Sequence, residues 1–238
     1  MKRFYSNNIQ SNFIYLIDEE AQHCTKVLRG KINDKIEVLN GNGILYERKI
    51  SNLQRHEVQI EISKILKEEK ENQNKLSIAI CPTKNPSRLE WFLEKATEIG
   101  IVNIFPILSD RTEKESIKQE RLQQIIISAA KQSGQLFFPT LHAIQPIKEL
   151  INNKNLKFSQ LFIAHCEEEA QKNHLKNSYK KGENALLLIG PEGDFTPKEI
   201  ELAINNNYIP VSLGNSILRV ETAGVVACSI VQLLNEKC

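Results

Sequence analysis

Two short apolar runs near the C-terminus constrain the fold of this chain more than any other feature. The first, at 186–189, leads into a Gly-Pro-Glu-Gly turn, and the second, at 209–213, ends at Gly214. Both have the length and composition of buried strands. Each glycine turn precedes a predicted helix. Strands of this kind place bare backbone at the C-terminal edge of a sheet, where open α/β folds bind their ligands.

The helix after the first glycine turn carries a clear start signal. Thr196 is the expected N-cap, Pro197 suits the first helical position, and Glu199 follows the cap by three residues, as a capping box requires. The helix after the second turn is expected to begin near Glu221. Alternation of strands and helices extends upstream to residue 75, which predicts an α/β fold with a largely parallel sheet covered on both faces. The other expected strands lie at 76–80, 102–108 and 161–164. One further helix is expected over 85–100, and a long helix after residue 108 is expected to end at Ser133.

The first 70 residues have a different, β-rich pattern. Residues 40–43, Asn-Gly-Asn-Gly, are a hairpin signal because they tolerate positive φ. The charged stretch 67–75 is interpreted as a linker, although a solvated strand end or helix fits the same composition. The chain is therefore expected to divide into a small domain at 1–70 and an α/β domain at 71–238. The expected strands of the small domain lie at 35–39, 44–50 and 57–62, after a short helix at 18–26.

Composition excludes several classes of protein. A net charge of +2 means that any contact with nucleic acid must come from local basic patches. The five cysteines are scattered, without a Cys-x-x-Cys pair, which disfavours a zinc site or a disulfide framework and favours a reducing compartment. The N-terminus lacks the apolar core of a signal peptide, and no run approaches the ~18 apolar residues of a membrane span. We expect a soluble cytoplasmic protein that does not enter a membrane.

Familiar cofactor and nucleophile motifs are missing from the sequence. It contains no G-x-G-x-x-G, no P-loop and no G-x-S-x-G elbow. His165, Cys166 and Glu167 are consecutive, and adjacent residues point in different directions at a strand end, so no metal is expected. What remains is the pair of glycine turns and the segment ILRVETAG at 217–224.

These two motifs closely resemble the SPOUT class of S-adenosylmethionine-dependent RNA methyltransferases. Within that class the chain is similar to the bacterial family that methylates N3 of a uridine in 16S ribosomal RNA. The similarity covers nearly the whole chain. Further matching segments are HCTKVLR at 23–29, EKATEIG at 94–100, SDR at 109–111 and AAKQSG at 129–134.

The resemblance implies properties that periodicity cannot show. It implies a PUA-like, RNA-binding β-barrel at 1–70 and a deep trefoil knot near the C-terminus, which is a rare exception among folds. It also implies a homodimer in which the last helix takes part. S-adenosylmethionine would be held largely by main-chain groups. By residue match its contacts would be Gly190, Pro191, Glu192, Gly193, Leu213, Gly214, Ile217 and Leu218, with Ala164 and His165 as a weaker third contact.

The reaction itself indicates what the side chains must do. Methylation at N3 of uracil needs loss of a weakly acidic proton, in-line orientation, and stabilisation of the anionic base. Arg219 is the first candidate to contact the base or its phosphate, because a guanidinium stays charged and matches a planar acceptor edge. Glu221 is either a base or a first-turn acid favoured by the helix dipole. His23, Arg29 and Arg111 are candidate RNA contacts, and His23 could instead cap backbone carbonyls.

Two residues depart from the pattern of the family. Asp194 follows GPEG where many relatives have glycine, and Gln135 follows Ser-Gly where arginine is common. Neither changes the expected substrate, which is 16S rRNA or the assembled small ribosomal subunit. Two alternatives stay open: a related enzyme acting on another RNA such as transfer RNA, and a non-catalytic RNA-binding assembly factor.

Overall fold

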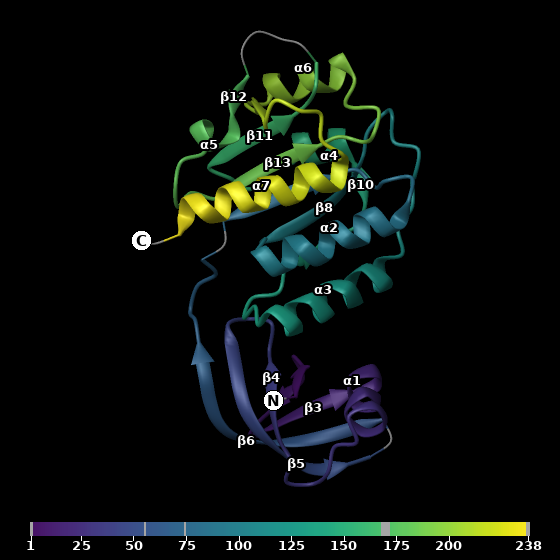
Figure 1. Cartoon of the computed structure of the whole chain (residues 1–238), viewed down its shortest axis with the longest axis vertical. Coiled ribbons are helices and arrows are strands. Elements are labelled where there is room, and N and C mark those ends of the chain that lie inside the picture. The colour runs from purple at the N-terminus through teal and green to yellow at the C-terminus, as the bar shows by residue number, and fades with distance from the viewer. Residues whose placement is uncertain (1, 55, 74, 168–171, 237–238) are drawn as a thin grey trace. The chain divides into compact units, whose positions relative to one another are not determined.

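A computed structural model describes residues 2–54, 56–73, 75–167 and 172–236 (Figure 1). Asn74 of the expected linker and the last cysteine, Cys238, lie outside these ranges. The chain forms two compact units, and each is described by itself. The first comprises Met1–Asn72 with Ile127–Phe138, and the second comprises Gln73–Ile126 with Pro139–Cys238.

The first unit is built on a curled six-stranded sheet with the order β1-β4-β5-β6-β3-β2 (Figure 1). All of its strand pairs are antiparallel except β1 with β4. This confirms the β-rich fold expected for the N-terminal part of the chain. The elements are β1 (Arg3–Tyr5), β2 (Ile9–Gln10), β3 (Phe13–Ile17), α1 (Asp18–Gln22), the π-helical turn η1 (His23–Val27), β4 (Lys35–Leu39), β5 (Ile44–Leu53) and β6 (Glu57–Glu68).

The predicted hairpin at 40–43 connects β4 to β5. Gly41 and Gly43 have φ angles of 72° and 96°, in the left-handed region that favours glycine. A Cβ on Gly43 would lie 2.3 Å from the carbonyl oxygen of Glu69, so only glycine fits there. Strand β6 continues to Glu68, which places the first residues of the expected linker in the sheet.

Residues 127–138 pack against the strands of the first unit. The Arg3 guanidinium donates a hydrogen bond of 2.8 Å to the Lys131 carbonyl and forms an ion pair with Glu37. Lys131 in turn pairs with Glu20, and the ring of Tyr5 stacks on Phe138 at 4.8 Å. These contacts join a segment distant in sequence to the N-terminal sheet.

The second unit contains an eight-stranded sheet with the order β10-β8-β7-β13-β11-β14-β12, and β9 pairs with β8. Every pairing in it is parallel, as predicted. Its strands are β7 (Leu76–Ile80), β8 (Asn103–Leu108), β9 (Thr140–Leu141), β10 (Gln145–Pro146), β11 (Gln160–Ala164), β12 (Asn173–His174), β13 (Ala185–Ile189) and β14 (Ile209–Ser212). Its helices are α2 (Pro86–Ile99), α4 (Ile147–Asn152), α5 (Leu175–Ser178), α6 (Pro197–Asn205) and α7 (Val220–Asn235). Helix α3 (Gln119–Ser133) begins in this unit, and its residues from Ile127 on belong to the first unit.

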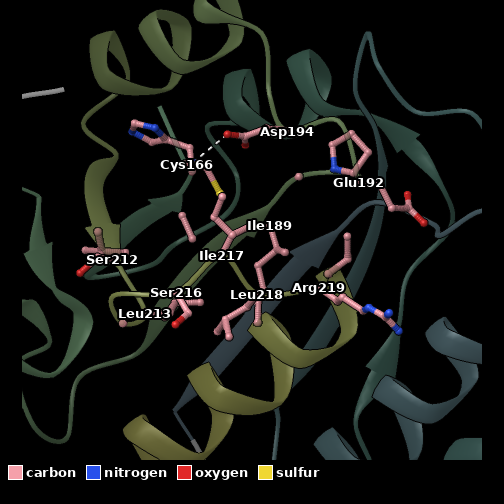
Figure 2. Close-up of a pocket in the computed structure, with 18 of the residues that line it drawn as sticks. Cys166, Ile189, Glu192, Asp194, Ser212, Leu213, Ser216, Ile217, Leu218 and Arg219 are labelled. Carbon is pink, nitrogen blue, oxygen red and sulfur yellow. Dashed lines mark hydrogen bonds between the residues drawn. The ribbon is translucent and has the colours of Figure 1, made fainter. Parts of the chain in front are cut away.

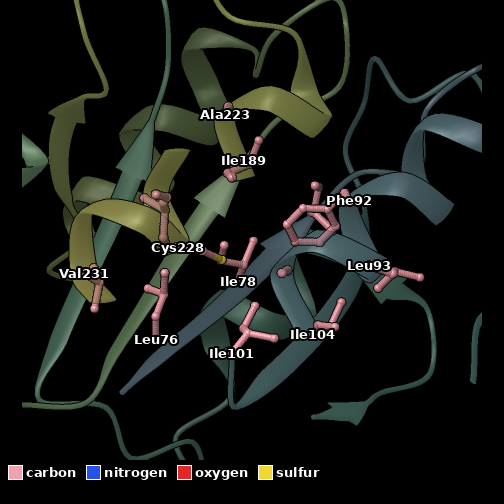
Figure 3. Close-up of a cluster of buried hydrophobic side chains, with 14 of the residues drawn as sticks. Leu76, Ile78, Phe92, Leu93, Ile101, Ile104, Ile189, Ala223, Cys228 and Val231 are labelled. Carbon is pink, nitrogen blue, oxygen red and sulfur yellow. The ribbon is translucent and has the colours of Figure 1, made fainter. Parts of the chain in front are cut away.

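Helices cover both faces of the parallel sheet. Leu76 and Ile78 of β7 belong to a core shared with α2 and α7, where Figure 3 shows them near Phe92 and Cys228. Ala79 of the same strand belongs to a second core formed with α4 and α6. Burial on both faces explains why these strands are almost continuously apolar. The trefoil knot implied by the family resemblance stays a prediction.

Candidate active site

A cavity of about 550 Å³ lies at the C-terminal ends of β11, β13 and β14 (Figure 2). This is the sheet edge that the two glycine turns predicted. Three loops form most of its wall, at 164–166, 190–194 and 212–219. Of the residues expected to bind the cofactor, all but Gly193 line it, namely Ala164, His165, Gly190, Pro191, Glu192, Leu213, Gly214, Ile217 and Leu218.

The glycine turn after β13 is held by close contacts. A Cβ on Gly190 would lie 3.1 Å from the amide nitrogen of Phe195, which leaves little space for a side chain. The carboxylate of Glu192 accepts a hydrogen bond of 3.0 Å from the backbone N–H of Lys84, in the loop after β7. The predicted capping box of α6 is present, with Thr196 and Glu199 bonded reciprocally. These contacts fix the backbone of the turn beside the cavity.

The conformation and hydrogen bonds of Asp194 account for aspartate at a position where many relatives have glycine. Its φ of 61° lies in the left-handed region, which asparagine and aspartate tolerate better than other non-glycine residues. Its carboxylate accepts hydrogen bonds from the backbone N–H of Phe195 at 2.8 Å and from that of Cys166 at 2.7 Å. Asp194 therefore joins the loop after β13 to the loop after β11, and Figure 2 shows the bond to Cys166.

Arg111, a candidate RNA contact from the sequence, is bound to this same turn. Its guanidinium donates to the carbonyl oxygen of Gly193 at 2.8 Å and to that of Phe195 at 3.4 Å. The neighbouring Asp110 donates its backbone N–H to the carboxylate of Glu199, which is fully buried. The loop after β8 thus supports the glycine turn from outside the cavity.

The loop after β14 presents apolar side chains and one arginine. Ile217 is 85% exposed in the cavity wall, an unusual position for an aliphatic side chain. Arg219 is the N-cap residue of α7, and Figure 2 shows its side chain beside that helix. Within the part of the chain that the structure describes, no hydrogen bond or ion pair engages its guanidinium. It is exposed and available to a ligand.

Glu221 lies in the first turn of α7 but is absent from the described residues that line the cavity. It is only 8% exposed. One carboxylate oxygen lies 3.8 Å from Nε of Arg88, in the first turn of α2, and Arg88 does line the cavity. Sequence reasoning missed Arg88. The available signal was its place just after β7, because the loops after parallel strands meet at one edge.

Cys166 and Lys172, which follow β11 in the chain, also line the cavity. Lys172 donates to the carbonyl oxygens of His165 and Glu167. Partial burial raises the pKa of the Cys166 thiol, and the carboxylate of Asp194 adds to this effect. The thiol is therefore protonated at neutral pH and is a weak nucleophile. Among the residues with described positions, no three His, Cys, Asp or Glu side chains form a metal-binding group.

The other two candidate RNA contacts lie in the first unit. His23 begins the turn η1, and its ring lies 5.8 Å from that of Phe4. Arg29 follows this turn with a φ of 49° and is exposed. In the described parts of the chain no helix is both long and apolar enough to cross a membrane.

Comparison with known proteins identifies both parts of the chain. A family model described as an RNA methyltransferase domain matches residues 70–232, and one described as an RNA methyltransferase PUA domain matches 16–63. The ribosomal RNA small subunit methyltransferase E of Mesomycoplasma hyopneumoniae is 30% identical over 94% of this chain and 96% of its own length.

Solved structures agree with this relationship over the full chain. A probable rRNA-methyltransferase from Porphyromonas gingivalis is 37% identical, with a TM-score of 0.87 over 99% of this chain and 98% of that one. The ribosomal RNA small subunit methyltransferase E of Neisseria gonorrhoeae, solved with S-adenosylmethionine bound, is 27% identical, with a TM-score of 0.83 over 99% and 98%. The chain therefore belongs to the RNA methyltransferase family, and within it to the ribosomal RNA small subunit methyltransferase E proteins.

Proposed function

We propose that this protein transfers a methyl group from S-adenosylmethionine to N3 of a uridine in 16S ribosomal RNA. The observation that carries the proposal is the cavity of about 550 Å³ at the C-terminal edge of the parallel sheet. Its size is typical of small-molecule sites, which span ~300–1,000 Å³. Main-chain groups of the glycine turns and the side chains of Ile189, Leu213 and Leu218 suit the polar and apolar parts of this cofactor.

The cofactor, when bound, supplies an electrophilic methyl group. The protein must then orient the uracil and stabilise the negative charge that develops on it. We assign this stabilisation to Arg219, because its guanidinium lines the cavity and is exposed. Glu221 was the sequence-based candidate for the base. Its burial behind Arg88 instead supports a role in positioning that arginine.

Nucleoside analysis by mass spectrometry tests this function directly. Purified protein and S-adenosylmethionine are incubated with small ribosomal subunits, or with 16S rRNA, from cells that lack the modification. We expect 3-methyluridine at a single site, and we expect Arg219→Ala to abolish it while leaving cofactor affinity intact. Methyluridine in transfer RNA alone would favour the first alternative, a related enzyme with another substrate.

Calorimetric titration with S-adenosylmethionine separates the enzyme from a non-catalytic assembly factor. We expect saturable binding that is lost in Gly190→Val, because the added Cβ would lie 3.1 Å from the Phe195 nitrogen. Gly182→Asn is the control, since a Cβ there meets nothing within 4 Å and asparagine tolerates the φ of 83° at this position. No binding by a folded wild-type protein would favour the assembly factor.

The protein is expected to bind RNA through its first unit and to pair with a second copy of itself. We assign RNA contacts to His23 and Arg29. The sequence also predicts an RNA contact for Arg111, but its hydrogen bonds to two carbonyl oxygens of the glycine turn favour a role in holding that turn. We place the reaction in the cytoplasm, where ribosomes assemble. The family resemblance supports a homodimer that uses α7. Leu233, which is 68% exposed on that helix, is consistent with it. Light scattering after size-exclusion chromatography measures the oligomeric state.

A further inference from the structure

Arg88 presents unused hydrogen-bond donors to the cavity. Its side chain is 36% exposed, and its nearest charged partner is an oxygen of Glu221 at 3.8 Å from Nε. That separation is an ion pair but exceeds a hydrogen bond. Within the described ranges no residue accepts a hydrogen bond from its guanidinium. Since a guanidinium carries five N–H donors, Arg88 can bind a ligand without giving up any existing bond.

Glu221 is placed to hold Arg88 and not to reach a ligand. It is 8% exposed, and its second carboxylate oxygen is buried without a hydrogen-bond partner among the described residues. A buried carboxylate needs a nearby positive charge, and Arg88 is the cation that the structure places beside it. The negative charge of Glu221 also suits the N-terminal end of α7, where the helix dipole is positive.

The two helices that carry this pair are fixed against each other. Gly224 of α7 packs so closely on α2 that an added Cβ would lie 2.4 Å from the ring of Phe92. This contact lies one helical turn beyond the pair, so the first turns of both helices start from closely packed segments. Arg88 is held there by a carboxylate behind it, which is an arrangement that positions a cation before its ligand arrives.

We propose that Arg88 contacts a negatively charged oxygen of the RNA substrate, and that Glu221 positions Arg88 instead of accepting the N3 proton. The inference deepens the proposed function and rests on it. The oxygen belongs either to the uracil, whose charge rises as N3 loses its proton, or to a phosphate beside it. A guanidinium matches both acceptors because its donors form a planar fork.

Four variants test the contact, with methylation of small-subunit RNA and calorimetric cofactor binding as readouts. The variants are Arg88→Gln, Arg88→Lys, Glu221→Gln and the double variant Arg88→Gln/Glu221→Gln. The matched control is Arg121→Gln, because Arg121 also pairs with a glutamate of α2, Glu90, but does not line the cavity. Wild-type activity is measured first, since its absence would refute the proposed function and not this inference.

We expect Arg88→Gln to lower kcat/KM for RNA by about 10- to 100-fold, the usual effect of losing a charge-assisted hydrogen bond. Cofactor affinity should stay unchanged, and Arg88→Lys should recover part of the loss. A fall in kcat with a shifted pH–rate profile identifies the uracil oxygen. A rise in KM with a weaker salt dependence identifies the phosphate. If Arg88→Gln behaves like Arg121→Gln while the wild type is active, the contact does not exist.

The double variant tests the role of Glu221. If Glu221 acts through Arg88, Glu221→Gln lowers the rate no more than Arg88→Gln does, and the double variant is no slower than Arg88→Gln alone. If Glu221 is the proton acceptor, Glu221→Gln nearly abolishes turnover and the two losses add. That second outcome would overturn the positioning role.

Discussion

Arg111 and Arg219 carry the same side chain at the same sheet edge but have different surroundings. Arg111 donates to two carbonyl oxygens of the glycine turn, those of Gly193 and Phe195. Arg219 is exposed at the cavity, and no described residue binds its guanidinium. The sequence made Arg219 the first candidate to contact the base or its phosphate, and Arg111 a candidate RNA contact. Hydrogen-bond partners, which the sequence does not give, distinguish them.

We expect Arg111→Ala to weaken S-adenosylmethionine binding about 10-fold, because it removes a charged donor that holds the turn. Arg111→Lys should recover part of this affinity. Calorimetry measures the affinity for S-adenosylmethionine, and filter binding measures the affinity for RNA. Unchanged cofactor affinity together with weakened RNA binding would instead support the RNA contact predicted from the sequence.

Arg48 is a fully buried charge in the first unit. Its three guanidinium nitrogens have no hydrogen-bond partner in the described structure, and its guanidinium lies 3.9 Å above the ring of Tyr46. Replacing even a paired buried charge by apolar side chains of similar volume is often neutral or stabilising by about 1–4 kcal/mol, and an unpaired charge has no ion pair to lose. A cation–π contact contributes about 1–2 kcal/mol. We expect Arg48→Met to raise the free energy of unfolding, as measured by urea denaturation. A lower free energy of unfolding would mean that the contact with Tyr46 stabilises the folded state by more than desolvation of the Arg48 guanidinium costs.

The stabilisation by Arg48→Met should change with pH only in strong base. Burial lowers the pKa of Arg48 to about 10, and Tyr46 opposes this shift. The folded state therefore loses the proton at lower pH than the unfolded state does, so wild-type stability should rise as the pH passes above about 10. Between pH 7 and 9 the difference between variant and wild type should be constant.

At the scale of elements, the contact between α2 and α7 fixes the cavity rim. Gly224→Ala would place a Cβ 2.4 Å from the Phe92 ring. Overpacking typically costs about 1–3 kcal/mol, and this exceeds the gain of about 1 kcal/mol from better helix propensity. We expect a lower urea midpoint for Gly224→Ala. Phe92→Leu should relieve the clash, so the double variant should be more stable than the sum of its single changes; strict additivity would contradict the clash.

Local sequence signals predicted the longer elements well. The capping box at Thr196 is present because its hydrogen bonds need only neighbouring residues, and the helix expected over 85–100 begins at Pro86 after the N-cap residue Asn85. Two-residue strands such as β9 (Thr140–Leu141) and β10 (Gln145–Pro146) were missed, since a strand that short has no detectable period. The π-helical turn η1 within the predicted helix at 18–26 was also missed.

At the scale of the whole molecule, the first unit includes a segment from the middle of the chain. Residues 127–138 contact it through Arg3 and Lys131 and through the stacking of Tyr5 on Phe138. Division at residue 70 into an RNA-binding domain and a methyltransferase domain stays a prediction. Removing residues 1–70 would also remove the partners of this segment.

We therefore expect deletion of 1–70 to lower the melting temperature as well as RNA affinity. Arg29→Ala is the sharper test, because Arg29 is exposed and its replacement should not disturb the core. It should weaken RNA binding and leave the melting temperature unchanged. The slope of the logarithm of the RNA-binding constant against the logarithm of the salt concentration should fall in magnitude by about 1. Normal RNA binding by Arg29→Ala would remove this residue from the interface.

The sequence by itself determined the strand–glycine–helix units, their caps, and the sheet edge that carries the cavity, because these depend on local periodicity and backbone freedom. Only the tertiary structure decided the strand order, in which β13 lies between β7 and β11. It alone brought Arg88 to Glu221 and Arg111 to Gly193, residues more than eighty positions apart. Such pairs arise from the packing of whole elements, which leaves no trace in the spacing of residues along the chain.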